Sequence, residues 1–417
     1  MTEPGQTSLS SRWLTDPVEC GEKAGFGIYL HVPFCAHRCG YCDFATYDDR
    51  DQLMGRYVAA LHLDIDRWAD RGPWPWASRP QAGGWGGSHE QDGGWHGWPP
   101  VTSVYVGGGT PTLLPPEDLA GILVAVRRRF FVSAAAEITV EANPESVDER
   151  VLTSLVAAGV NRLSIGAQSF SAHVLTTLER RHDPERPLVA VAAAREAGLK
   201  NVSIDLIYGT PGESDQDWEG TVQAVLAAQT EHVSAYALTV AANTPLARRV
   251  ATGAMTPPDG DVQRRRFDLI RERLADAGFD HYEVANWARS SAYRCRHNLL
   301  YWRHGDYLGI GVGAHSHYRG RRWWSHRSIE RFCAAIEQGE PALSGAESPS
   351  EHERSEERLL LGLRLKDGLH PCDLPPLRRE AVEDIVRAGL ARVCCGRLQA
   401  TDAGWFLLDE TLARLLA

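Results

Sequence analysis

The sequence predicts an α/β fold: a partial barrel of six strand–helix units, followed by a C-terminal extension and a small helical domain. Three observations predict it. Short apolar runs alternate with helix-like stretches over residues 25–255. The chain has 417 residues, which is enough for two to three domains. Apolar residues make up 43% and charged residues 24%, and this ordinary globular composition excludes a largely disordered or fibrous chain.

Six short apolar runs are the expected buried strands. They are Ile28–Pro33, Ser103–Val106, Glu137–Val140, Arg162–Ile165, Val202–Ile207 and Val233–Ala237. The helix-like stretches that follow the first five are Arg50–Ala69, Glu117–Arg129, Asp148–Ala158, Leu188–Ala197 and Asp215–Ala227. Gly159 and Gly198 supply ordinary stop signals after two of these helices. The alternation favours parallel strands covered by helices, as in a TIM-like partial (β/α)6 barrel, with the chemistry at the carboxyl ends of the strands.

One stretch, residues 72–100, interrupts the alternation. It contains eight of the 39 glycines, five of the 23 prolines and five of the 13 tryptophans, and it shows neither a helix nor a strand period. We interpret it as an irregular loop inserted between two elements. A binding surface formed by its tryptophans is the alternative.

The pattern changes after residue 255. We expect a helix over Val262–Ala277, a strand near His281–Ala285 and then an aromatic and histidine-rich region, Tyr293–Trp324. The end of the chain is typical of a small helical domain with a short β-turn, much like a winged helix. We divide the chain into an N-terminal tail (1–24), the barrel (25–255), a mixed α/β extension (256–345) and a helical C-terminal domain (346–417).

Charge and targeting signals restrict the function classes. The net charge is −10 and the pI is about 5.9, so we expect no nucleic-acid partner, and a winged helix here would serve packing rather than DNA contact. The N-terminus lacks the pattern of a signal peptide, and the chain lacks the long apolar run of a membrane span. Nine cysteines, an odd number with three close together, do not resemble a disulfide framework. We therefore expect a cytoplasmic protein whose clustered cysteines serve a metal or catalysis.

The clustered cysteines are Cys35, Cys39 and Cys42, spaced C-x3-C-x2-C directly after the first expected strand. Three thiolates from one loop suit a four-iron, four-sulfur (4Fe-4S) cluster that keeps one iron open to a small molecule. Zinc is the alternative, with His31 or His37 as a fourth ligand. No second pair of zinc ligands appears nearby, which favours the iron–sulfur cluster.

Polar and glycine residues follow the later strands. Gly108, Gly109 and Thr110 belong to a GGGTPT segment after the second strand, where glycines let the backbone approach a ligand closely. The polar side chains of the series are Glu141, Gln168, Arg180 and Asp205. A single acid of this kind is more often a helix cap or an arginine partner. As a series at successive strand ends, they suit one polar ligand lying across the barrel mouth.

These motifs together resemble the radical S-adenosylmethionine (SAM) superfamily. The resemblance implies a radical SAM partial barrel, a 4Fe-4S cluster on Cys35, Cys39 and Cys42, and a bound SAM molecule. The SAM contacts that it implies are Tyr29, Gly108, Gly109, Thr110, Glu141, Gln168, Arg180 and Asp205.

Within the superfamily, the order of motifs resembles the subgroup of oxygen-independent coproporphyrinogen III oxidase and the HemW-type heme chaperones. The motifs are Y-x-H-x-P-F-C, GGGTPT, E-x-N-P, G-x-Q-S-F and D-L-I-Y-G-x-P. Three features favour the chaperones. Phe44 stands where the oxidase carries a further cysteine, Cys35 comes early in the chain, and an H-N-x-x-Y-W motif spans His297–Trp302.

The H-N-x-x-Y-W motif makes His297 the expected axial ligand of heme iron, because neutral imidazole suits that role. Tyr301 and Trp302 would flank the porphyrin plane. A hydrogen-bonded structural histidine is the alternative for His297. The rival ligands that the sequence leaves open are Cys295, His315 and His317.

The resemblance implies a heme chaperone that passes heme to hemoprotein recipients, including a respiratory enzyme of the membrane reached by transient contact at its surface. Such a chaperone would lack oxidase activity, and no catalytic residue is assigned. The alternative is an oxygen-independent coproporphyrinogen III oxidase, which would decarboxylate its substrate to protoporphyrinogen IX through a radical derived from SAM.

Overall fold

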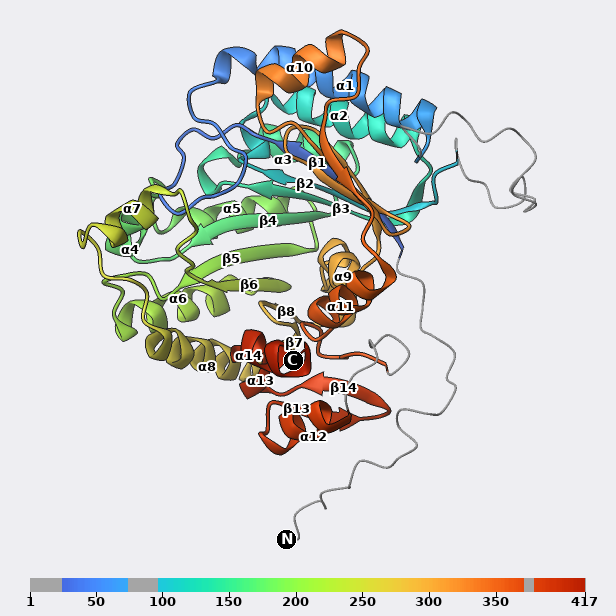
Figure 1. Ribbon diagram of the computed structural model, residues 1–417. Helices are drawn as coiled ribbons and strands as arrows, with labels where there is room; N and C mark the ends of the chain where they lie inside the picture. Colours follow the sequence, from blue (N-terminus) through green and yellow to red (C-terminus); the bar gives the residue numbers. More distant parts are fainter. Residues whose placement is uncertain (1–24, 74–96, 371–378, 417) are drawn as a thin grey trace.

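A single twisted sheet runs through most of the molecule in the computed structural model, which describes residues 25–73, 97–370 and 379–416 (Figure 1). The strand order is β12-β11-β10-β9-β1-β2-β3-β4-β5-β6-β8-β7. The strands of the barrel are β1 (Phe26–Val32), β2 (Val101–Gly108), β3 (Val132–Ala142), β4 (Arg162–Gln168), β5 (Val202–Tyr208) and β6 (His232–Ala237). These six are parallel and adjacent in chain order, which confirms the predicted α/β partial barrel.

Helices cover the outer face of this barrel. They are α1 (Met54–Arg71), α2 (Pro116–Arg129), α3 (Glu149–Ala157), α5 (Arg186–Glu196), α6 (Asp215–Ala228) and α8 (Gly260–Asp276). The short helices α4 (Ala172–Thr177) and α7 (Pro245–Ala251) lie together near the carboxyl ends of the strands (Figure 1). All the helices predicted in this region are present, whereas the sequence did not predict the short helices α4 and α7. Asp148 caps α3 by accepting from the Val151 amide, and Ser214 forms a capping box with Asp217 on α6.

The second half of the chain adds strands to both ends of the barrel sheet. These strands are β7 (Asp280–Glu283), β8 (Asn286–Ala288), β9 (Asp306–Ile310), β10 (His315–Tyr318), β11 (Arg321–Ser325) and β12 (Leu343–Glu347). Strand β9 pairs in parallel with β1, so Ile28 lies opposite Leu308. The histidine-rich region thus borders the first strand of the barrel, although about 280 residues separate them in sequence.

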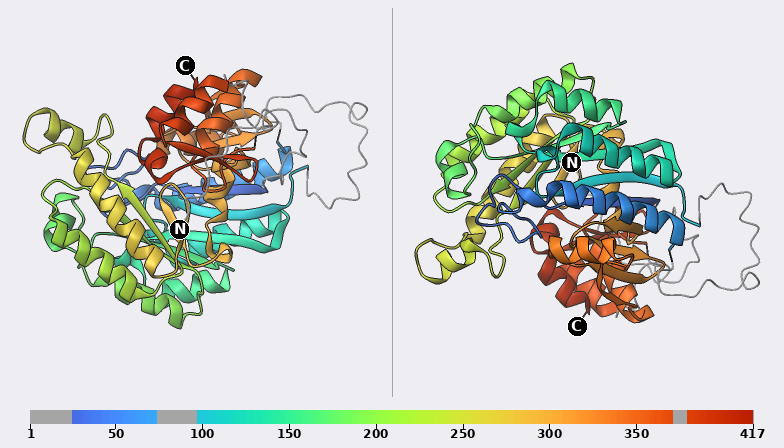
Figure 2. Two further views of the ribbon diagram at one scale, coloured as in Figure 1. Left: turned by 90° about the horizontal axis from the view of Figure 1, so that it is seen from below. Right: turned by 90° about the horizontal axis from the view of Figure 1, so that it is seen from above.

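The remaining helices are α9 (Arg296–Trp302), α10 (Ile329–Glu337), α11 (Glu351–Gly362), α12 (Arg379–Arg387), α13 (Asp402–Phe406) and α14 (Leu408–Leu416). The expected β-turn near the C-terminus is a hairpin of β13 (Ala391–Cys394) and β14 (Arg397–Ala400). In both views of Figure 2, these C-terminal elements (red) and helices α3 to α6 (green) lie on opposite sides of the molecule.

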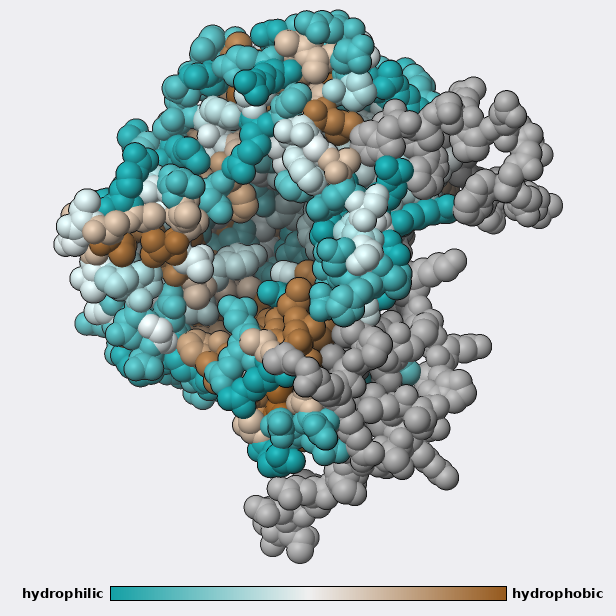
Figure 3. Space-filling model, in the orientation of Figure 1, coloured by the Kyte–Doolittle hydropathy of each residue, from teal (hydrophilic) through white to brown (hydrophobic). Residues whose placement is uncertain are grey.

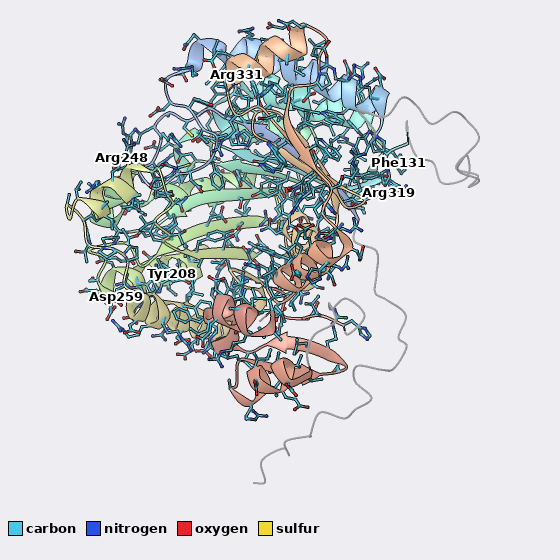
Figure 4. All side chains as sticks on the ribbon, viewed as in Figure 1. Phe131, Tyr208, Arg248, Asp259, Arg319 and Arg331 are labelled. Atoms are coloured by element: carbon cyan, nitrogen blue, oxygen red, sulfur yellow. The ribbon has the colours of Figure 1, made fainter. Side chains whose placement is uncertain are left out.

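Two main groups of buried apolar side chains support the fold. The larger group fills the space between the sheet and the outer helices. Strand β1 is buried along almost its whole length, because both faces of a parallel sheet are covered. The other group joins α11, α12 and α14 to the hairpin. Figure 4 shows Tyr208 at the carboxyl end of β5 on the same side of the molecule as Arg248 of α7. That is the side at which a barrel site is expected.

The tryptophan-rich stretch is described only in part, because its residues 74–96 lie outside the described ranges. Trp98 is 2% exposed, stacks on Phe26 at 5.2 Å between ring centroids and donates from Nε1 to the carbonyl oxygen of Trp68. At least one of the five tryptophans therefore belongs to the core.

Candidate functional site

Two cavities lie on either side of the cysteine loop, where they share Asp43 and Phe44 as lining residues. The first, here the cluster cavity, has a volume of about 510 Å³ and is bordered by residues of β2 to β6 and by the cysteine loop. The second, here the histidine cavity, has a volume of about 620 Å³ and lies between the cysteine loop, α9, α11 and the β10–β11 hairpin. Figure 3 shows this face hollowed near its middle, with hydrophobic residues (brown) on the side of the hollow next to α11.

The three clustered cysteines line the cluster cavity together. All three are free thiols on the loop that follows β1. Burial, with the neighbouring thiols Cys42 and Cys39, raises the pKa of Cys35 to about 11. Among the described residues, no three histidine, cysteine, aspartate or glutamate side chains are close enough to hold one metal ion. A 4Fe-4S cluster is larger than one ion, and all three cysteines border the cavity in which it would lie.

The glycine segment lies directly against the cysteine loop. The Gly109 amide donates to the carbonyl oxygen of Val32, and the Thr110 amide donates to that of Phe34, both at 2.8 Å. A Cβ atom on Gly109 would lie 2.5 Å from the Phe34 oxygen and 3.0 Å from the Cys35 sulfur. Glycine is therefore required here for the close approach of two backbones, as the sequence suggested.

Two carboxylates line the same cavity with their oxygens already bonded. Glu141 accepts from the Tyr105 hydroxyl at 2.7 Å and from the Gly108 amide at 3.1 Å. Burial raises the pKa of Glu141 to about 7, since these bonds oppose the shift only in part. Asp205 accepts from the hydroxyls of Ser164 and Ser203. These bonds fix Glu141 near the carboxyl end of β3 and Asp205 in the middle of β5, with their remaining lone pairs available to a ligand.

Arg180 reaches the cavity from the connection after α4. Its Nη2 donates to the Gly166 carbonyl at 2.8 Å and to Asn143 Oδ1 at 3.1 Å, and its Nη1 lies 3.8 Å from the Cys39 sulfur. Its buried Nε has no partner among the described residues. Gln168, in the left-handed region with φ 64°, completes this wall at a bulge in β4. An unpaired buried donor is an observation that fits an anionic group in the cavity.

Ten of the twelve predicted site residues therefore line one cavity: Cys35, Cys39, Cys42, Gly108, Gly109, Thr110, Glu141, Gln168, Arg180 and Asp205. Tyr29 is not among them. It lines the histidine cavity, where its hydroxyl lies 3.0 Å from His31 Nδ1.

His297 lines neither cavity. It is 1% exposed on α9, with Nδ1 at 2.9 Å from the Ser103 hydroxyl and Nε2 at 2.8 Å from the Tyr301 hydroxyl. Burial lowers its pKa to about 3, so the ring is neutral. Because both ring nitrogens are hydrogen-bonded, this geometry fits the structural alternative that the sequence left open.

Of the other candidate heme ligands, one lies outside both cavities and two line the histidine cavity. Cys295 is fully buried, with its sulfur 3.7 Å from Glu137 Oε1, and lines neither cavity. His315 and His317 both line the histidine cavity, as does Tyr301. Asn298 borders the cluster cavity instead, so α9 lies between the two.

Sequence reasoning missed several residues of the cluster cavity, among them Tyr105 and Arg162. Arg162 is 2% exposed, contacts His232 through Nη2 and leaves Nε and Nη1 without a partner among the described residues. The sequence did contain a pattern that could have identified both residues. Along β2 and β4, every second residue is polar or glycine, which marks one strand face as lining a polar interior.

Comparisons with known proteins agree with this arrangement. The family model of the radical SAM superfamily matches residues 93–225. The heme chaperone HemW of Mycobacterium tuberculosis is 40% identical over 94% of this chain and 95% of its own. HemW of Bacillus subtilis is 29% identical over 93% and 98%.

A solved structure shows the same fold. Coproporphyrinogen III oxidase (HemN) from Escherichia coli, described as a radical SAM enzyme, has a TM-score of 0.77 at 20% identity, covering 94% of this chain and 90% of that one. Among the described residues, no helix is long and apolar enough to cross a membrane. With a relative 40% identical along nearly the whole length of both chains, this protein belongs to the HemW heme chaperone family of the radical SAM superfamily.

Proposed function

We propose that this protein binds heme and delivers it to hemoprotein recipients, and that its barrel holds a 4Fe-4S cluster and SAM. One observation carries the proposal: the 40% identity with a heme chaperone extends over 94% of the chain, so it covers the barrel and the histidine-rich region alike. A relative that matched the barrel alone would support only radical SAM chemistry.

Cys35, Cys39 and Cys42 would hold the cluster. When bound, such a cluster supplies single-electron transfer and an iron with an open position. The chain's own contribution is the shape of the site. Gly109 lets the strand end approach the cysteine loop, and the guanidinium of Arg180 lies 3.8 Å from the Cys39 sulfur.

The remaining residues of the cluster cavity would bind SAM. Glu141 and Asp205 would accept hydrogen bonds from hydroxyl or amino groups, and the free Nε of Arg180 would donate to a carboxylate. Gly108, Gly109, Thr110 and Gln168 would line the same ligand. Contact between Tyr29 and SAM stays a prediction, because Tyr29 lines the neighbouring cavity.

Heme ligation by His297 also stays a prediction. It would require the ring to give up its bond to Ser103 or to Tyr301. We further propose that the protein acts in the cytoplasm and meets a membrane-bound recipient only at the membrane surface.

Anaerobic reconstitution followed by two assays tests the function. The reconstituted protein should bind about one heme per chain, followed as a Soret absorption change during titration with hemin. It should leave coproporphyrinogen III unchanged over the time in which a coproporphyrinogen oxidase converts it. Sustained decarboxylation would contradict the proposal and favour the oxidase alternative, and the absence of saturable heme binding would contradict it as well.

A further inference from the structure

We propose that the histidine cavity is the heme site and that His317 Nε2 is an axial ligand of the iron. This inference rests on the proposed heme-binding function and adds the place and the ligand. The volume of about 620 Å³ lies within the range of roughly 300–1,000 Å³ that is typical of small-molecule and cofactor sites.

His317 has the hydrogen bonding of a metal-binding histidine. It is 6% exposed, and its Nδ1 lies 2.9 Å from the carbonyl oxygen of Gly305. A carbonyl only accepts, so Nδ1 carries a proton, and in the neutral ring Nε2 is then the nitrogen with the free lone pair. Asp306 Oδ1, 3.4 Å from the same Nδ1, adds a carboxylate behind the ring. A carbonyl or carboxylate on one ring nitrogen is the usual way to orient the other toward a metal.

The Nε2 atom of His317 is the unexplained feature of this wall. It is buried and has no hydrogen-bond partner among the described residues. A buried acceptor of this kind is costly unless something pairs with it. The histidine cavity is the space that this side chain lines, and heme iron is a Lewis acid of the kind that imidazole nitrogen binds.

The other histidines on the wall are less suited. His31 has both nitrogens occupied, by the Tyr29 hydroxyl and the Ala45 carbonyl oxygen. His304 has Nε2 at 3.2 Å from Glu357. His315 is exposed and stacks on Trp324 at 5.7 Å between ring centroids.

The rest of the cavity suits a porphyrin. Its lining is largely apolar and aromatic, with Tyr301 packed edge-to-face on Tyr307 at 4.7 Å and with Leu360 on α11. Arg327 supplies positive charge where a carboxylate of the porphyrin edge can be held, whereas Arg322 is already paired with Glu347 and Glu357. The one glutamate on this wall, Glu357, is already paired with Arg322 and His304.

Titration of the full-length protein with two ligands tests the assignment. Hemin contains iron, whereas protoporphyrin IX presents the same macrocycle and propionates without it. His317→Ala should weaken hemin binding by more than the ~10–100-fold that loss of an outer-shell partner costs, and should shift the Soret maximum and the ferric EPR signal. The affinity for protoporphyrin IX should stay within a fewfold of the unmodified protein. Added imidazole should restore the original hemin spectrum.

Two matched variants serve as controls. His304→Ala removes a histidine of the same wall whose Nε2 faces a carboxylate, and His297→Ala removes the ligand predicted from the sequence. Both should retain the spectrum of ligated heme.

Each other result has a definite meaning. An unchanged hemin spectrum and affinity in His317→Ala would overturn the assignment. Equal loss of hemin and protoporphyrin IX binding would also overturn it, because the variant would then have lost the cavity rather than the ligand. If the unmodified protein binds neither compound, the proposed function itself fails.

Discussion

His297 and His317 are both buried imidazoles on elements of the same half of the chain, yet their hydrogen bonds differ. His297 uses both ring nitrogens, one toward Ser103 and one toward Tyr301. His317 uses only Nδ1. Since a metal ligand must offer a lone pair, the bonding pattern rather than the motif distinguishes the two.

Glu141 should make the stability of the ligand-free protein depend on pH. Burial raises its pKa from 4.5 to about 7, so between these values the folded state binds more protons than the unfolded state, and stability falls as pH rises. Each unit corresponds to about 1.4 kcal/mol, which gives a loss of roughly 3 kcal/mol as an upper bound because water reaches the cavity.

Glu141→Gln should remove this part of the pH dependence. The midpoint of urea unfolding, measured at pH 5 and at pH 8 in cluster-free protein, should differ less in the variant than in the unmodified chain. Equal differences in the two proteins would show that Glu141 does not titrate in this range.

Gly109→Ala should impair both folding and cluster assembly. The new Cβ would lie 2.5 Å from the Phe34 carbonyl oxygen and 3.0 Å from the Cys35 sulfur. Overpacking of this kind costs roughly 1–3 kcal/mol. Gly220 is the matched control, because it is exposed within α6 and a Cβ there would meet no atom within 4 Å. Gly220→Ala should raise the free energy of unfolding by about 1 kcal/mol, since alanine favours a helix over glycine. Thermal unfolding and iron content after reconstitution measure both effects, and full iron loading in Gly109→Ala would contradict the prediction.

At the scale of elements, the strands were predictable and their partners were not. Apolar runs identify β1 to β6 because both faces of a parallel sheet are buried. Strand β3 begins at Val132, five residues before the expected Glu137, because pairing with Val101 of β2 extends it through a stretch of alanines. Local sequence holds no signal for such pairing.

Trp98 provides a test at this scale. It precedes β2, stacks on Phe26 and is 2% exposed, so Trp98→Ala should destabilise the protein by roughly 3–5 kcal/mol. Phe131, labelled in Figure 4, is 44% exposed, and Phe131→Ala should change stability by less than about 0.5 kcal/mol. Denaturant unfolding compares the two. Similar losses of unfolding free energy in the two variants would mean that Trp98 does not belong to the folded core.

At the scale of the whole molecule, the two cavities share a wall. Asp43 and Phe44, directly after the last cluster cysteine, border both. Phe44 is 63% exposed and occupies the position at which the related oxidase was expected to carry a cysteine. A ligand in either cavity would border the same loop, which offers a route for coupling between the two sites.

Cluster assembly should accordingly change heme affinity. A cluster that binds the three thiolates would order the loop, so heme binding would no longer have to supply the conformational entropy lost in ordering it. The dissociation constant for hemin should therefore be several-fold lower in reconstituted than in cluster-free protein. Cys42→Ser, which removes one thiolate, should abolish the difference. Identical hemin titrations with and without the cluster would contradict the coupling.

The sequence by itself determined the local features: six buried strands, their helices, the three-cysteine loop and the polar residues at the strand ends. Each follows from residues close together in the chain or from the rule that carboxyl ends of parallel strands meet at one edge. The division into four segments, 1–24, 25–255, 256–345 and 346–417, stays a prediction.

Only the tertiary structure decided which residues share a cavity. It joined β9 to β1, brought His317 beside the cysteine loop, placed Tyr29 in the second cavity and bonded both nitrogens of His297. The physical reason is that a side chain's role depends on which of its polar atoms remain unpaired after folding. That pairing arises from contacts between distant parts of the chain, which spacing and residue type do not encode.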